Sequence, residues 1–147
     1  MMQCNRRPNA KAFIQGSEQF PELRGEVLFY QERDGALISA RVRGLPKNET
    51  GFYGFHIHEG DSCNGKGFPD AKGHYNPKDH PHPSHAGDLP PLLSNHGNAY
   101  LSVKTDRFRL RDIIGRTVII HGGTDDFRTQ PSGDAGEKIA CGVIKAV

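Results

Sequence analysis

The stretch Phe52-Tyr53-Gly54-Phe55-His56-Ile57-His58-Glu59 combines aromatic, β-branched and imidazole side chains in one short run. That composition is typical of a β-strand. Side chains alternate between the two faces of a strand, so His56 and His58 should point one way and Phe55 and Ile57 the other. Two imidazoles on one face, backed by apolar residues that enter a core, predict half of a transition-metal site.

Segments of similar composition recur on both sides of this stretch, and turn residues such as Asp34-Gly35 separate them. Spacing of about 8–12 residues between short strands is typical of a sandwich or barrel. No helix longer than a turn is expected, so the sequence predicts an all-β fold. The expected strands lie at residues 11–15, 25–31, 36–43, 52–59, 98–103, 107–110, 116–121 and 138–146.

Two irregular segments interrupt the strand pattern: residues 60–91, called the histidine loop below, and residues 122–136, called the second loop. A loop as long as the first needs a functional reason in a compact domain. The reason is visible in its composition, because it contains His74, His80, His82 and His85.

The end of the histidine loop has the residue types of a metal site. His82 and His85 stand close to Asp88, and three imidazoles with one carboxylate suit tetrahedral zinc. Imidazole sites without thiolate also suit copper. His121 adds a further ligand at a strand end, and Asp125 is a candidate acceptor for the second N–H of a metal-bound histidine.

Length, charge and cysteine content limit the other functions. A chain of 147 residues predicts a single domain, here residues 10–147 after a flexible N-terminus, residues 1–9. A net charge of +2 argues against nucleic acid as a partner. No apolar run is long enough for a membrane helix, and no secretory signal is visible, so we expect a cytoplasmic protein, with export to an oxidising compartment such as the periplasm as the alternative. Three cysteines argue against a dense disulfide framework.

Five segments, in order along the chain, resemble the copper–zinc superoxide dismutase family, in its bacterial type with a short zinc loop. The resemblance covers roughly residues 10–147. It implies an eight-stranded antiparallel Greek-key barrel or sandwich with two long functional loops. The segments are 54–59 (GFHIHE), 73–77 (GHYNP), 85–89 (HAGDL), 114–121 (IGRTVIIH) and 133–144 (GDAGEKIACGVI).

The resemblance also implies the chemistry and the residues that perform it. Superoxide would be converted to dioxygen and hydrogen peroxide at copper, with His74 as the catalytic proton donor and Lys138 attracting the anion. A disulfide would join Cys63 to Cys141, and Asp125 would link His56 with His82 outside the metal sites. The implied copper ligands are His56, His58, His74 and His121, and the implied zinc ligands are His74, His82, His85 and Asp88.

The chain departs from the family pattern in its loops and at one catalytic position. His80 and His82 compete for one zinc position, and we favour His82 because it stands closer to His85. Lys138 replaces the arginine of the family's active site, and an ammonium attracts an anion without the planar fork that orients one. The second loop is short and carries Arg128, a second candidate for steering the anion.

Two other functions remain open. One is a copper- and zinc-binding relative of the same fold without catalysis, with a structural or storage role. The other is a zinc hydrolase with Glu59 as its general base, although this residue should point away from His58 on a regular strand. Family members occur as monomers and as dimers, so a homodimer is also open.

Overall fold

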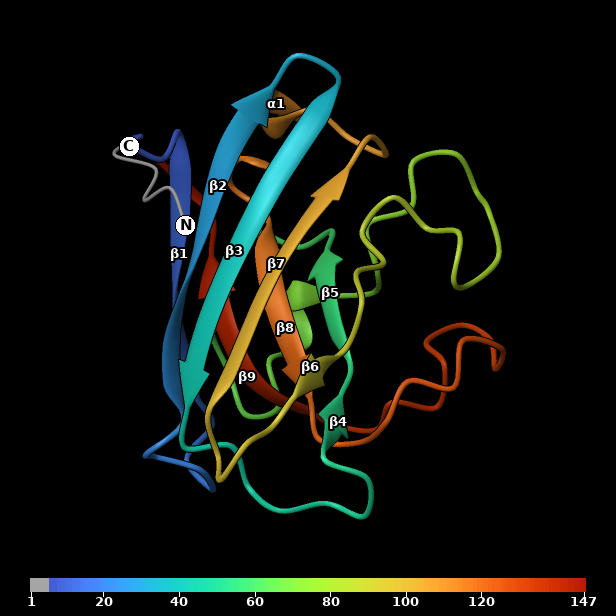
Figure 1. Ribbon diagram of the computed structural model, residues 1–147. Coiled ribbons are helices and arrows are strands. Elements are labelled where there is room, and N and C mark those ends of the chain that lie inside the picture. Colours follow the sequence, from blue (N-terminus) through green and yellow to red (C-terminus); the bar gives the residue numbers. More distant parts are fainter. Residues whose placement is uncertain (1–5) are drawn as a thin grey trace.

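The structure is a computed structural model that describes residues 6–147, and its main element is one curled, eight-stranded antiparallel sheet (Figure 1). Seven strands follow the order β5-β8-β9-β1-β2-β3-β7, and β10 pairs with β1. This arrangement confirms the all-β prediction and agrees with the barrel expected from the family. The strands are β1 (Ala10–Gly16), β2 (Arg24–Glu32), β3 (Gly35–Arg43), β5 (Phe55–His58), β7 (Ala99–Thr105), β8 (Thr117–His121), β9 (Lys138–Val143) and β10 (Lys145–Ala146).

The strand order explains why the metal-binding candidates meet. β3 pairs with β7 rather than with the next strand in sequence, so the chain between them crosses to the other side of the sheet as β4 (Phe52–Tyr53), β5 and β6 (Leu92–Leu93). β5 then pairs with β8 in antiparallel register, with His56 opposite Ile119. Both irregular loops leave from this part of the sheet and project beyond it on the same side (Figure 1).

The core follows the alternation of the strands. Ala10, Ala12 and Ile14 of β1 are buried, whereas Phe13 between them is 63 % exposed. β8 differs, because all five of its residues are buried. It lies between β5 and β9, and the short 3₁₀ turn η1 (Pro69–Ala71) of the histidine loop contributes Ala71 to the cluster that packs on Ile119.

Two expected strands differ from the structure. Residues 107–110 were expected as a strand, but they lead into one helical turn, α1 (Leu110–Ile113). The prediction is wrong: Phe108 and Leu110 are both buried, as alternation on a strand would require, but Phe108 lies before the helical turn, and the turn itself brings Leu110 and Ile113 into the core. The expected strand 52–59 is interrupted at Gly54, whose N–H donates to the carbonyl of Gly123 over 3.0 Å.

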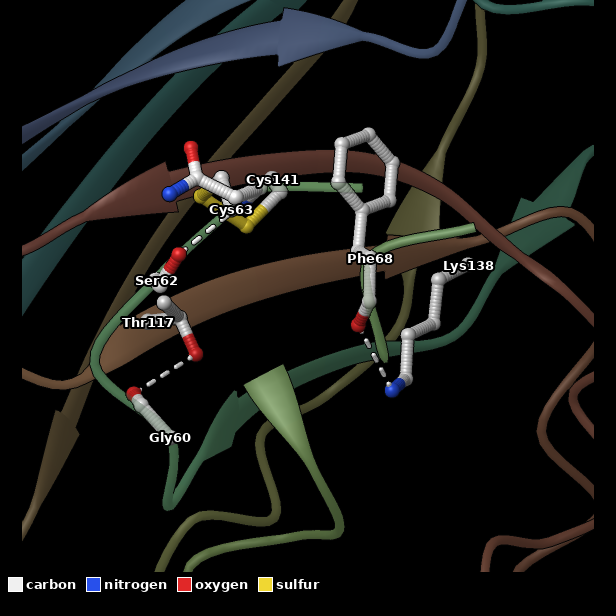
Figure 2. The surroundings of a disulfide bond; sticks show 8 residues. Gly60, Ser62, Cys63, Phe68, Thr117, Lys138 and Cys141 are labelled. Carbon is white, nitrogen blue, oxygen red and sulfur yellow. Dashed lines mark hydrogen bonds between the residues drawn. A yellow bond between two sulfur atoms is a disulfide. The ribbon is translucent and has the colours of Figure 1, made fainter. Parts of the chain in front are cut away.

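A disulfide and a hydrogen bond fasten the histidine loop to β9 (Figure 2). Cys63 and Cys141 are joined across 78 positions of sequence, as the family resemblance implied. Near them, Lys138 Nζ donates to the carbonyl of Phe68 over 3.1 Å. The start of the histidine loop is therefore fixed to the same strand that carries Lys138.

The N-terminal residues 1–9, expected to be flexible, are described only from residue 6 onward. Residues 1–5, which include Cys4, lie outside the described residues. Arg6 Nη1 contacts Glu32 Oε2 at 2.7 Å, and the N–H of Asn9 donates to the carbonyl of Phe29 over 2.8 Å.

Within residues 6–147, no helix has the length and apolar character needed to span a bilayer.

Candidate metal centre

Two strands and the histidine loop bring four histidines together at one end of β5. His56 and His58 lie on the same face of β5, while Phe55 and Ile57 enter the hydrophobic core, as the alternation predicted. His121 ends β8, and its Nε2 lies 3.2 Å from Nε2 of His58. His74 completes a group whose ring nitrogens all lie within 4.8 Å of one another, and all four rings are buried.

A second group forms where the histidine loop folds back on itself. His74 Nδ1 lies 2.8 Å from Asp88 Oδ1 and 3.1 Å from His85 Nδ1. The Nδ1 atoms of His82 and His85 lie 3.0 and 3.2 Å from Asp88 Oδ2. Ligand atoms of a tetrahedral zinc ion at about 2.0–2.1 Å would be separated by about 3.3 Å, which is close to these distances.

His56 also lies near the second group, because ligand atoms of His56, His74, His82 and Asp88 are all within 4.8 Å of one another. The hydrogen-bond pattern favours His85 over His56. His85 Nδ1 lies 3.1 Å from His74 Nδ1 and 3.2 Å from Asp88 Oδ2, so it faces two members of the group directly. His74 belongs to both groups in either case.

Three buried ring nitrogens have no hydrogen-bond partner within the described part of the chain: His56 Nδ1, His74 Nε2 and His82 Nδ1. His82 Nδ1 is close to Asp88, but the direction of that contact does not make a hydrogen bond. Unpaired buried polar atoms are costly and therefore rare. Their positions fit metal ions, because each unpaired nitrogen faces one of the two groups and a lone pair there can become a metal bond.

The other nitrogen of each strand-borne ring is held by an oxygen acceptor. His58 Nδ1 donates to the carbonyl of Lys72 over 2.7 Å, and His121 Nδ1 donates to the carbonyl of Gly136 over 3.0 Å. Such contacts fix the ring orientation and select the nitrogen that is left for a metal.

Asp125 belongs to neither group, but it links one histidine of each by hydrogen bonds. Its Oδ2 accepts from His56 Nε2 over 2.8 Å, and its Oδ1 accepts from His82 Nε2 over 2.8 Å. These hydrogen bonds overcome the effect of burial and hold the pKa of Asp125 well below its usual range. The residue is therefore a fixed negative charge between one ring of each group.

Burial keeps the strand-borne rings neutral near pH 7. It lowers the pKa of His56 to about 4, although the hydrogen bond to Asp125 opposes the shift. Burial and the neighbouring His56 lower the pKa of His121 to about 3, and burial also lowers the pKa of His58. Neutral imidazoles have a free lone pair, which is the form that binds a metal.

Asp88, the carboxylate of the second group, is held in the ionised form that binds a cation. Burial alone would raise the pKa of Asp88, but the hydrogen bond and charge of His74 lower it below its ordinary value. Asp88 is thus ionised, and its two oxygens face three imidazoles.

The remaining predicted residues differ in their distance from the two groups. Lys138 is near enough to His121 to contribute to the lowering of its pKa, and burial lowers the pKa of Lys138 itself. His80 is exposed and lies apart from both groups, in contrast to the buried His82. Arg128 and Glu59 are also exposed.

Some residues that shape the site were not predicted from the sequence. The carbonyls of Lys72 and Gly136 have no sequence signature, because every residue has a carbonyl group. Gly133 lies so close to Asp125 and His82 that a Cβ atom there would be 2.0 Å from Asp125 Oδ1 and 2.6 Å from His82 Nε2. A glycine within the second loop was a visible signal, but the sequence did not show which side chains it approaches.

The fold and the site define a class of protein: an antiparallel β-barrel with two adjacent groups of buried histidines, both of which include His74. Comparison with known proteins agrees, since the model of the copper/zinc superoxide dismutase (SODC) family matches residues 23–144. The chain therefore belongs to the copper/zinc superoxide dismutase family.

Individual relatives are also named copper–zinc superoxide dismutases. The chain is 37% identical over 139 residues to copper–zinc superoxide dismutase 2 of Aquifex aeolicus, which covers 84% of this chain and 80% of the relative. It is 37% identical to the Legionella pneumophila copper–zinc superoxide dismutase, over 82% of this chain and 77% of that protein. The Claviceps purpurea enzyme of the same name is 40% identical over 82% of this chain and 88% of its own length. The protein is thus a superoxide-disproportionating enzyme with copper and zinc as cofactors.

Proposed function

We propose that copper is held by His56, His58, His74 and His121, and zinc by His74, His82, His85 and Asp88. The observation that carries this assignment is the set of unpaired buried nitrogens, because each lies on a ring of these two groups. His74 is the bridging residue, with Nδ1 toward the second group and Nε2 unpaired.

The reaction combines two superoxide anions and two protons into one dioxygen and one hydrogen peroxide. Bound copper supplies the one-electron exchange, while zinc, which has no redox chemistry, supplies fixed charge and holds the loop. In the proposal, His74 Nε2 would hold either copper or a proton, never both. It takes up a proton in the first half-reaction, while it would be free of copper, and gives that proton to the second superoxide as peroxide forms. Lys138 attracts each anion to the site through its charge, which is close to His121.

Lys138 is suited to attract an anion but not to orient it. Its ammonium donates to the carbonyl of Phe68 over 3.1 Å, and this hydrogen bond holds the group in place (Figure 2). Arg128 is exposed in the second loop and is a weaker candidate for the same role.

Superoxide dismutation and metal content, measured on the same sample, test the assignment. We expect one copper and one zinc per chain together with activity. His121→Ala should abolish turnover while zinc stays bound, because His121 belongs only to the first group. Full activity in this variant would contradict the copper ligand set.

Two alternatives predict different outcomes of the same experiment. A relative without catalysis would bind the ions and leave a superoxide flux unchanged. A zinc hydrolase would contain zinc alone and need Glu59 beside the ion, but that side chain is exposed beyond the end of β5.

For the assembly we propose a homodimer through the outer face of β1. Phe13 there is 63 % exposed, and Val147, which lines the same surface pocket, is 67 % exposed. Exposed apolar patches mark contact surfaces. Light scattering tests it: a dimer that Phe13→Gln converts to a monomer supports the proposal, and a monomer in both proteins contradicts it.

The disulfide between Cys63 and Cys141 bears on the cellular compartment of the protein. Disulfides persist in oxidising compartments, which supports the exported alternative. Cys141 is only 2 % exposed, and this burial protects the bond from reductants and is compatible with the cytoplasm. Cell fractionation with thiol trapping distinguishes the two locations.

A further inference from the structure

The backbone around His82 is held by a side chain from another loop. Gln130 of the second loop contacts both polar backbone groups of this one residue: its Oε1 accepts from the N–H of His82 over 2.8 Å, and its Nε2 donates to the carbonyl of His82 over 2.8 Å. The ring of His82 is held by Asp125 of the same loop. The second loop therefore fixes His82 at both its backbone and its ring.

A second side chain holds the other end of the same turn. Arg107, which lies between β7 and α1, donates from Nη1 to the carbonyl of Pro83 over 2.8 Å and to the carbonyl of His85 over 3.1 Å. Hydrogen bonds from a charged donor are stronger than neutral ones. The turn between His82 and His85 is thus held from two directions, by residues that do not belong to the histidine loop.

The turn needs this support because it has little regular structure of its own. Between His82 and His85 the structure has no strand or helix, and one backbone hydrogen bond closes the turn, from Ser84 to Pro81 over 2.7 Å. A ligand on such a segment binds a metal only in the fraction of time that its ring is correctly placed, and the apparent affinity falls with that fraction. Residues that restrict the backbone therefore raise metal affinity without touching the ion.

We propose that Gln130 and Arg107 are positioning residues for zinc, acting through the backbone of His82 and of Pro83–His85. The proposal rests on the zinc ligand set given above. Both side chains act from the outside of the turn, and Gln130 is exposed. Three of the four hydrogen bonds to the turn are only partly buried. Because the turn that they hold carries His82 and His85, their loss should lower zinc retention more than it lowers the stability of the metal-free protein.

The test is the rate at which zinc leaves the fully loaded protein for an excess of a chelating dye. Loss of a residue that supports a ligand from outside the metal site typically costs 10–100-fold in metal affinity, and we expect about tenfold faster release for Gln130→Ala and for Arg107→Ala. Arg107→Lys should restore slow release in large part, because an ammonium also donates to two carbonyls. Gln130→Glu should release zinc quickly, since its carboxylate would face the carbonyl of His82.

Matched controls separate positioning from general damage. Gln15→Ala and Arg111→Ala remove the same residue types from exposed positions on β1 and α1, and both should release zinc at the rate of the unaltered protein. Cobalt placed in the zinc site gives a second readout, because its visible spectrum should change in Gln130→Ala and Arg107→Ala and stay unchanged in the controls.

Failure of this inference is distinct from failure of the ligand assignment. Asp88→Asn should lose zinc if the assignment is correct, and zinc retained in that variant would overturn the ligand set. If Asp88→Asn loses zinc but Gln130→Ala and Arg107→Ala release it at the unaltered rate, the positioning role is wrong. An equal loss of metal-free stability and zinc retention in both variants would overturn it as well.

Discussion

Asp125 lies where two imidazoles from distant parts of the chain meet. It accepts one hydrogen bond from His56 and one from His82, each over 2.8 Å, so both of its oxygens are used as acceptors. An asparagine has only one acceptor oxygen, and its amide N–H groups would face the N–H of the other ring. The loss of charge and the mismatched donor both weaken the hold on the rings.

Asp125→Asn should therefore reduce zinc affinity by about 10–100-fold, the usual range for such partners of metal ligands. Competition with a chelating dye measures the change. Asp134→Asn is the control, because Asp134 is exposed in the same loop and its left-handed backbone (φ 53°) also accepts asparagine. Equal zinc affinity in both variants would contradict a special role for Asp125.

Gly133 leaves room for that carboxylate. A Cβ atom there would overlap with Asp125 Oδ1 at 2.0 Å, and the backbone has φ +72°. Gly133→Ala should lower the free energy of unfolding by about 1–3 kcal/mol, through strain and overpacking, and should also reduce the zinc content. Thermal unfolding and metal analysis measure the two effects.

Two other glycines separate the causes. Gly67 has φ +76° with nothing within 4 Å of the added atom, so Gly67→Ala reports the backbone effect alone. Gly73 also has open space there and no positive φ, so Gly73→Ala should change little. Zinc loss in Gly67→Ala as large as in Gly133→Ala would argue against contact with Asp125 as the cause.

At the scale of elements, the disulfide links β9 to the start of the histidine loop. The bond is packed with Phe68, Ala71 and Ile119 in a small buried cluster. It closes a segment with a sequence separation of 78, which restricts the unfolded chain considerably.

Replacement of both Cys63 and Cys141 by serine should lower the free energy of unfolding of the metal-free protein by about 4 kcal/mol in the chain-entropy model. Urea unfolding measures the difference. Cys4→Ser, at a position outside the described residues, is the thiol control and should leave the midpoint unchanged. A loss below about 1 kcal/mol would show that the loop is held mainly by its other contacts.

The sequence was most informative where a regular element carries the ligands. The alternation in β5 was enough to predict which face His56 and His58 share, because a strand has a fixed period of two. It was least informative at residues 107–110, where a period of two also fits side chains buried by a single helical turn. Such short segments are decided by what they pack against, which the sequence alone does not show.

The parts of the site that depend on backbone atoms could not be predicted from the sequence either. His58 and His121 each use a carbonyl from a loop, and those carbonyls are positioned by the folded loop rather than by a residue type. The ligand set itself was accessible only because five motifs resemble a known family. Histidine spacing alone left His80 and His82 as alternatives.

At the scale of the whole molecule, the buried histidines couple stability to pH. The folded-state pKa of His56 is about 4 and that of His121 about 3, compared with an unfolded value of 6.5. In this range the unfolded chain binds more protons than the folded one, so acid favours unfolding.

The metal-free protein should therefore keep full stability above about pH 6.5 and lose it progressively as the pH falls from there through about 4. Urea unfolding at a series of pH values measures this dependence. A free energy of unfolding that stays constant or rises as the pH falls from 6.5 to 4 would contradict the burial of neutral rings.

Residues 126–131 form an exposed run directly after Asp125, and they include Gln130. The run provides no ligand, but the residues at its two ends hold metal-binding candidates. Asp125, just before the run, contacts the rings of His56 and His82, and Gln130, near its other end, holds the backbone of His82. A single proteolytic cut there would release these contacts together. The two ions would then escape from one nicked molecule at the same time, although every residue bound to them is still intact.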